Sequence, residues 1–142
     1  MAEPRPYVAA ALICEKVLRE ETGVASLIRI VDVFTVPPQP QLPPDTKSGL
    51  PLTAFVALKS GSVTGKHPVF LRLHLPSGET KSVPELTEEF RGDEHGVSYV
   101  FQIVLEVKEY GLYWFDVVWD DQTVLTRIPF RLRQAEGTQQ PS

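Results

Sequence analysis

The feature that most constrains the fold of this chain is a strict alternation of apolar and polar side chains. Between residues 69 and 75 every second position is a branched aliphatic residue: Val69, Leu71, Leu73 and Leu75. Phe70, Arg72 and His74 occupy the positions between them. A repeat of two is typical of a strand with one buried and one partly solvated face. The segment therefore predicts a strand that borders a core.

Further segments predict strands on the same grounds, namely alternation and a high content of β-branched and aromatic residues. They are Tyr7–Arg19, Val24–Val36, Leu52–Lys59, Val97–Val107, Leu112–Trp119 and Thr123–Arg133. The alanines of the first would also suit a helix. The turn at Glu21-Thr22-Gly23 and the β-branched residues that follow favour a long hairpin, with Val24–Val36 as one continuous strand.

Two segments do not alternate. Pro37–Pro51 holds six of the 13 prolines, and we expect an extended surface loop there. Thr80–Gly96 is polar, and it suggests an acidic crossover or one helical turn around Pro84–Glu89.

About seven strands with at most one short helical turn predict an all-β fold, an antiparallel immunoglobulin-like sandwich. A closed barrel is the alternative. A chain of 142 residues fits a single domain. We expect a flexible N-terminus over 1–6, one sandwich domain over 7–133 and a disordered tail over 134–142.

Composition and charge limit the partners and the cellular location that we expect. A formal net charge of −4 argues against a nucleic-acid partner, unless the basic residues gather on one face. The apolar runs are far too short to span a membrane, and the first residues lack the charge pattern of a signal peptide. The single Cys14 permits no internal disulfide. We therefore expect a cytoplasmic protein.

Two resemblances bear on the fold. The segment from Lys108 through Asp120-Asp121 to Leu132 resembles the closing hairpin of immunoglobulin-like domains. The stretch Ala11–Glu15, the turn at Gly23, Ile30–Asp32 and the prolines after Val36 are similar to a family of small bacterial β-sandwich proteins of unknown function. That resemblance implies a fold and a bacterial origin, and it supplies no catalytic residues.

The residues offer little for catalysis. Cys14 beside Glu15 could be a nucleophile, but alternation puts the two side chains on opposite faces and Cys14 in the core. The histidines His67, His74 and His95 lack the spacing of metal ligands. The glycines of residues 60–66 lack the spacing of a phosphate-binding loop. We expect no enzyme, cofactor or resident metal.

One alternative function remains open at the end of the sandwich. Asp93 and Glu94 in one loop, and Asp120 and Asp121 in another, could together bind an ion or a small ligand. The simpler interpretation is a pair of solvated turns, because Asp tolerates turn geometry.

The strongest indication of a function is a strand with large apolar side chains on both faces. In Leu112–Trp119 one face carries Tyr113, Phe115 and Trp119, and the other carries Leu112, Trp114 and Val118. If the first face is core, the second is covered either from within the chain or by a partner. We hypothesise a non-enzymatic interaction or structural module that binds a protein partner or a second copy through Leu112, Trp114 and Val118.

Overall fold

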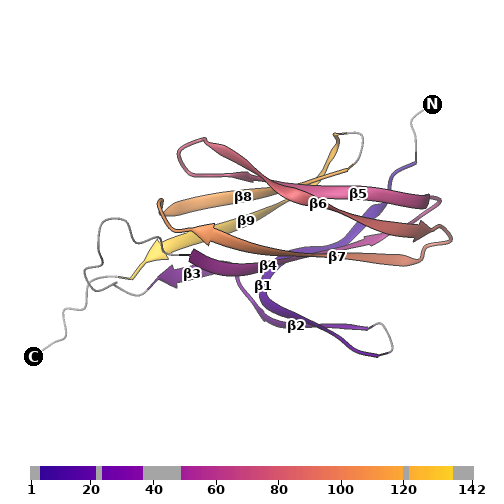
Figure 1. Ribbon diagram of the computed structural model, residues 1–142, viewed down its shortest axis with the longest axis horizontal. Coiled ribbons are helices and arrows are strands. Elements are labelled where there is room, and N and C mark those ends of the chain that lie inside the picture. The colour runs from indigo at the N-terminus through magenta and orange to yellow at the C-terminus, as the bar shows by residue number, and fades with distance from the viewer. Residues whose placement is uncertain (1–3, 22–23, 37–48, 120–121, 136–142) are drawn as a thin grey trace, which may run out of the picture.

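The protein is all-β, as predicted. The computed structural model describes residues 4–21, 24–36, 49–119 and 122–135, and these form nine strands in two sheets (Figure 1). The strands are β1 (Tyr7–Arg19), β2 (Ala25–Ile30), β3 (Val33–Val36), β4 (Gly49–Lys59), β5 (Thr64–His74), β6 (Thr80–Arg91), β7 (Gly96–Glu106), β8 (Gly111–Val118) and β9 (Val124–Gln134).

The two sheets differ in pattern. The four-stranded sheet has the order β2-β1-β4-β7 and is antiparallel throughout. The five-stranded sheet has the order β3-β9-β8-β5-β6 and is mixed, because β3 runs parallel to β9. The mixed sheet departs from the fully antiparallel immunoglobulin-like sandwich that the sequence predicted.

The prediction of one continuous strand over Val24–Val36 is wrong. The chain leaves one sheet and enters the other between Val31 and Asp32: Val31 N donates to Ile13 O of β1 at 2.8 Å, whereas Asp32 O accepts from Arg131 N of β9 at 3.1 Å. Arg29 has a positive φ of 55°, which interrupts the regular extended backbone just before the crossing. The segment therefore forms β2 in one sheet and β3 in the other.

The predicted helical turn around Pro84–Glu89 is also wrong, because Thr80–Arg91 is a strand, β6. It forms an edge of the five-stranded sheet, and its pairing with β5 shifts register between Val69 and Leu71. Pro84 lies in that irregularity, where a missing amide donor breaks no regular ladder bond. With β6 and the split of Val24–Val36, the predicted seven strands become nine.

Two predicted boundaries shift by a few residues. Within the predicted proline loop, residues 37–48 lie outside the described part of the chain, and Gly49, Leu50 and Pro51 already belong to β4. Gln134, the expected start of the tail, is the last residue of β9, and residues 136–142 also lie outside the described part.

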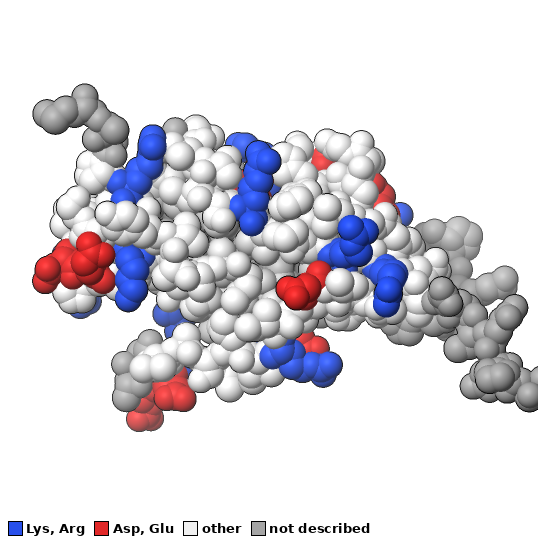
Figure 2. Space-filling view, turned by 180° about the vertical axis from the view of Figure 1, so that it is seen from behind, with Lys and Arg blue, Asp and Glu red and all other residues white. Residues whose placement is uncertain are grey.

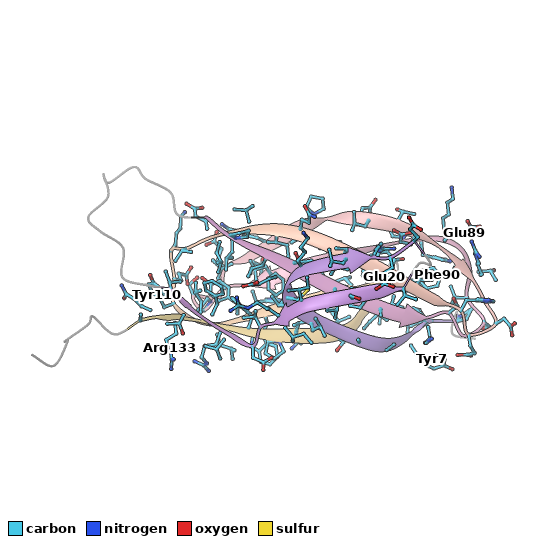
Figure 3. All side chains as sticks on the ribbon, turned by 90° about the horizontal axis from the view of Figure 1, so that it is seen from below. Tyr7, Glu20, Glu89, Phe90, Tyr110 and Arg133 are labelled. Atoms are coloured by element: carbon cyan, nitrogen blue, oxygen red, sulfur yellow. The ribbon has the colours of Figure 1, made fainter. Side chains whose placement is uncertain are left out.

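The core lies between the two sheets, and its residues confirm the buried faces that the alternation predicted. Val69, Leu71, Leu73 and Leu75 are buried, and so are the inward residues of β8, Tyr113, Phe115 and Val117. Tyr99 of β7 packs among them and donates its hydroxyl hydrogen to His67 O at 2.8 Å. Figure 3 shows the side chains along the sandwich, with Tyr110 and Arg133 at one end and Tyr7, Glu89 and Phe90 at the other.

Strands β1 and β2 form a bent hairpin. The first half of β1, Tyr7–Cys14, pairs with β4, and the second half, Cys14–Arg19, pairs with β2. The β1–β2 hairpin thereby turns away from the plane of β4 and β7, the other two strands of its sheet (Figures 1 and 3). Arg19 Nη2 donates to Ser98 O of β7 at 3.3 Å, which ties the far end of the hairpin to that sheet.

Candidate functional site

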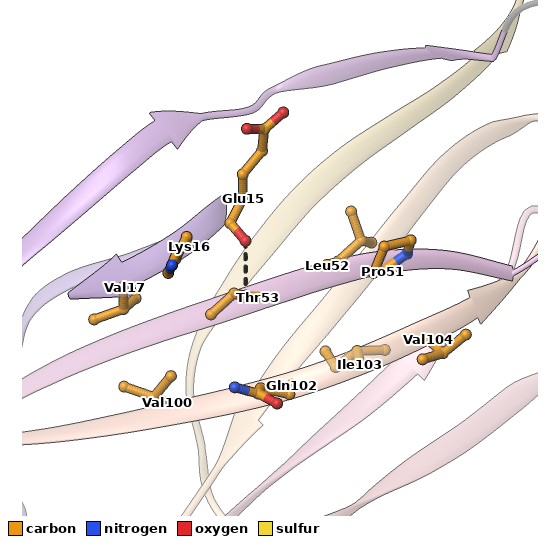
Figure 4. A pocket seen from close by; sticks show the side chains of 10 residues that line it. All are labelled: Glu15, Lys16, Val17, Pro51, Leu52, Thr53, Val100, Gln102, Ile103 and Val104. Carbon is orange, nitrogen blue, oxygen red and sulfur yellow. Dashed lines mark hydrogen bonds between the residues drawn. The ribbon is translucent and has the colours of Figure 1, made fainter.

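The outer face of the four-stranded sheet carries a groove beneath the hairpin. The groove has a volume of about 490 Å³ and lies between residues of β1 (Glu15, Lys16, Val17), β4 (Pro51, Leu52, Thr53) and β7 (Val100, Gln102, Ile103, Val104) (Figure 4). Thr53 Oγ1 donates to Glu15 O at 3.2 Å, which links β4 to β1 within the lining of the groove.

This groove holds few groups that could recognise a ligand. Figure 4 shows the Glu15 carboxylate pointing away from β4, and that carboxylate lies 3.6 Å from Arg29 Nε. The other lining side chains are mostly aliphatic, and Val104 is 74% exposed. A binding pocket normally directs several unpaired polar groups at a ligand, but the Glu15 carboxylate and the Thr53 hydroxyl already have partners within the chain, which leaves Lys16 and Gln102 as the other polar lining residues.

The outer face of the five-stranded sheet is built differently. Trp114 of β8 points outward and is 37% exposed, with His74 of β5 and Pro129 of β9 in register on either side. Leu112, two positions earlier, shares this face and is half-buried. We call the outward side chains of β5, β8 and β9 the Trp114 face.

A buried carboxylate lies at the centre of the Trp114 face. Asp116 is only 2% exposed, and its Oδ2 lies 2.7 Å from His74 Nε2. Arg127 Nε lies 3.1 Å from Oδ1 and forms an ion pair, although the contact does not have hydrogen-bond geometry. Arg72 is in register with Asp116 on β5, and its guanidinium lies 5.6 Å from the centre of the Phe70 ring. A buried charge requires such partners, so Asp116 fixes the positions of His74 and Arg127.

The cluster does not form a catalytic triad in the described part of the chain. A carboxylate and a histidine can orient a general base, but a nucleophile must then bond to the histidine. Among the described residues, no hydroxyl or thiol is hydrogen bonded to His74. Cys14 is buried in the other sheet, and burial raises the pKa of its thiol, which disfavours the reactive thiolate.

The three predicted interface residues have different environments. Trp114 is exposed and Leu112 is half-buried, so both remain available for a partner. Val118 is 0% exposed, between Phe70 and Val124 in register, at a point where the β8–β9 pairing shifts. The expectation that Val118 is exposed is therefore wrong, because the chain itself covers that side chain.

The loop-end site is described only in part. Asp93 and Glu94 form the β6–β7 turn with positive φ values of 52° and 60°, whereas Asp120 and Asp121 lie outside the described residues. In the part of the chain that the structure describes, no three His, Cys, Asp or Glu side chains are grouped as metal ligands would be. His67 stacks on Trp119 with ring centres 4.9 Å apart, and His95 Nδ1 lies 3.0 Å from Gly92 O. Ion binding at this end stays a prediction.

Sequence reasoning missed the His74–Asp116–Arg127 cluster. Alternation already placed Arg72 and His74 outward on one strand, and the same alternation puts Asp116 between Trp114 and Val118. A carboxylate in a row of large apolar residues was the available signal. Its partners depend on the register between β5, β8 and β9, which the sequence does not reveal.

Charge separates the Trp114 face from the rest of the protein. Five basic side chains point outward from β5 and β9 (Lys66, Arg72, Arg127, Arg131 and Arg133), against the single carboxylate of Asp116. Each alternates with residues that point into the core, and the whole chain nonetheless has a net charge of −4. Figure 2, the view from behind, shows Lys and Arg side chains spread along the length of the molecule, with Asp and Glu side chains among them.

The described part of the chain contains no helix with the length and apolarity that a membrane crossing requires.

Comparison with known proteins adds information on the fold alone. No protein-family model and no curated protein matches the sequence. Among solved structures, the chain is similar to the Pseudomonas fluorescens alkylpurine DNA glycosylase AlkC bound to DNA containing an abasic site analogue, with a TM-score of 0.52 and 10% sequence identity. The match covers 93% of this chain and 31% of the glycosylase, so this chain spans about a third of that protein's length. At this identity the likeness concerns the two-sheet β fold and does not extend to an activity.

Proposed function

We propose that the protein is a non-enzymatic interaction module, and that the Trp114 face is where its protein partner binds. The observation that carries the proposal is a partly exposed tryptophan with basic side chains around it, on a sheet face where the buried Asp116 contacts His74 and Arg127. Tryptophan and arginine are the residue types most enriched among those that dominate binding energy at protein interfaces. His74 and Arg127 already contact Asp116, so these side chains lose less conformational freedom when a partner binds.

The Trp114 face is a better candidate for partner binding than the groove, because the two outer sheet faces differ in how far the chain covers them. The β1–β2 hairpin already covers part of the four-stranded sheet, as the Arg19–Ser98 and Thr53–Glu15 hydrogen bonds indicate. In the described structure no comparable segment lies across Trp114, Pro129 and Arg131. An open sheet face with a large aromatic residue is the better docking surface.

We also propose an immunoglobulin-like relationship for the fold. In immunoglobulin domains the strands B and E share one sheet and C, F and G share the other. The placement of β4 with β7, and of β5 with β8 and β9, supports this assignment. Tyr113 adds support, because its hydroxyl donates to Glu109 O just upstream of β8, as in the tyrosine corner before strand F. A bacterial origin and a cytoplasmic location remain part of the proposal.

Photocrosslinking tests the binding face. We expect that a photoreactive aromatic residue, p-benzoylphenylalanine, in place of Trp114 forms an adduct with a protein partner in cells of the source organism upon irradiation. The adduct is detected by mass shift on a denaturing gel and identified by mass spectrometry. An adduct with a second copy of the chain would support the self-associating form of the proposal.

The matched control carries the same photoreactive residue in place of Val104. Val104 is an exposed apolar residue on a strand of the opposite sheet, so it reports nonspecific encounters. Equal adducts from both positions, or none from position 114, would contradict the proposed binding face.

A further inference from the structure

The charge of the Trp114 face identifies the chemistry of its partner. We infer that the face binds an extended acidic segment of a protein, in which carboxylates flank one apolar anchor residue. This inference rests on the proposed function and adds the class of partner. Charge complementarity is the observation that selects it, because the basic residues gather on this face of a chain whose net charge is −4.

Four of the five basic side chains of this face have no carboxylate partner among the described residues. Arg127 is held by Asp116, but Lys66, Arg72, Arg131 and Arg133 form no ion pair with any carboxylate of the described residues. Arg131 and Arg133 are exposed and alternate with Phe130 and Leu132 of the core. The edge strand β6 adds Glu89 and Arg91 in outward register and an exposed Glu85 at the irregularity opposite Phe70, so the basic side chains still outnumber the carboxylates.

The geometry suits an extended segment with one apolar anchor. Along β9, Arg127, Pro129, Arg131 and Arg133 occupy successive outward positions, which a strand spaces by about 6–7 Å. A second extended chain presents alternate side chains at the same interval, so its carboxylates can follow the arginines. Trp114 lies in register with Pro129 and Leu112 with Arg131, which places an apolar contact beside the basic row.

A protein segment fits better than a nucleic acid. Single-stranded nucleic acids bind through several exposed aromatic rings on which successive bases stack. On this face Phe70 is half-buried, with the Arg72 guanidinium 5.6 Å from its ring centre, and Trp114 is the one exposed aromatic side chain of β5, β8 and β9. The net negative charge of the protein also repels a polyanion at long range more strongly than it repels a short peptide.

The test uses a fluorescein-labelled peptide of alternating glutamate and valine with one central leucine, titrated with the intact protein by fluorescence anisotropy. We expect a Kd of about 10–100 μM at low ionic strength, and weaker binding as salt is added. Arg131→Glu should weaken binding about tenfold or more, and Trp114→Ala should also weaken it. The same peptide with lysine in place of glutamate should not bind.

Lys16→Glu is the matched control. It changes the net charge of the protein as Arg131→Glu does, but it lies on the hairpin outside the opposite sheet. We expect it to change the affinity by less than about twofold. Equal weakening by Lys16→Glu, or equal binding of the lysine peptide, overturns the inference.

A single-stranded oligothymidylate of the same charge tests whether the partner is a nucleic acid and not a protein segment. If it binds more tightly than the acidic peptide, and Arg131→Glu abolishes that binding, the partner is a nucleic acid and the inference is wrong. If neither probe binds while the photoreactive residue at position 114 still forms its adduct, the acidic-segment inference fails and the proposed function stands.

Discussion

Phe115→Ala should lower the free energy of unfolding by about 3–5 kcal/mol. Phe115 is fully buried between the sheets, in register with Leu73 of β5 and Ile128 of β9. The substitution removes the ring's contacts and leaves a cavity that its strand neighbours cannot fill without moving. Urea denaturation followed by circular dichroism measures the change.

Val104→Ala is the control for Phe115→Ala. It also shortens an apolar side chain within a strand, β7, but Val104 is mostly exposed. Its effect should stay within about 0.5 kcal/mol. Similar losses for the two variants would mean that the inward and outward faces of the strands are assigned wrongly.

Val118→Asp should destabilise the protein by more than about 3 kcal/mol. The sequence alone suggested that Val118 belongs to an exposed interface, whereas the structure buries it fully beside Phe70 and Val124. A carboxylate at that position would lose its hydration without a partner of opposite charge. Thermal and urea denaturation of the variant measure the effect.

Leu112→Asp provides the comparison on the same strand and face. Leu112 is half-buried and lies in register with Arg131, so a carboxylate there keeps water and gains a basic neighbour. The Leu112→Asp substitution should lower the free energy of unfolding by about 1 kcal/mol or less.

If Val118→Asp fails to fold, Val118→Thr is used in its place. It changes the polarity at nearly constant volume and should lower the free energy of unfolding by about 1–2 kcal/mol. Equal stability of Val118→Asp and Leu112→Asp would place Val118 at the surface.

Much of the fold follows from local pattern. The alternation in β5, β7, β8 and β9 gave the strands and their buried faces, because each strand has one apolar side that only a second sheet can cover. The buried position of Cys14 followed in the same way. These features depend on neighbours along the chain, which the sequence displays directly.

The remaining features depend on contacts between distant residues. The split of Val24–Val36 arises because Val31 bonds to β1 and Asp32 to β9, and neither bond has a local signal. Strand β6 carries polar residues on both faces because it is an edge strand, so it lacked the pattern of a core strand. The burial of Val118 and the Asp116 cluster depend on strand register, where one step of slip reverses every side chain.

Trp114 lies on an open and basic surface, and fluorescence quenching tests this placement most directly. The chain has two tryptophans, and the second, Trp119, is 3% exposed with Phe90 and His67 beside it. Collisional quenching of fluorescence in the single-tryptophan variants Trp119→Phe and Trp114→Phe therefore reads each site separately. We predict that iodide quenches Trp114 several times more strongly than Trp119. We also predict that the ratio of iodide to caesium quenching at Trp114 exceeds the ratio for free N-acetyltryptophanamide, because the basic side chains attract the anion. Equal quenching of the two tryptophans, or a ratio at Trp114 below that of the free compound, would contradict an open basic face.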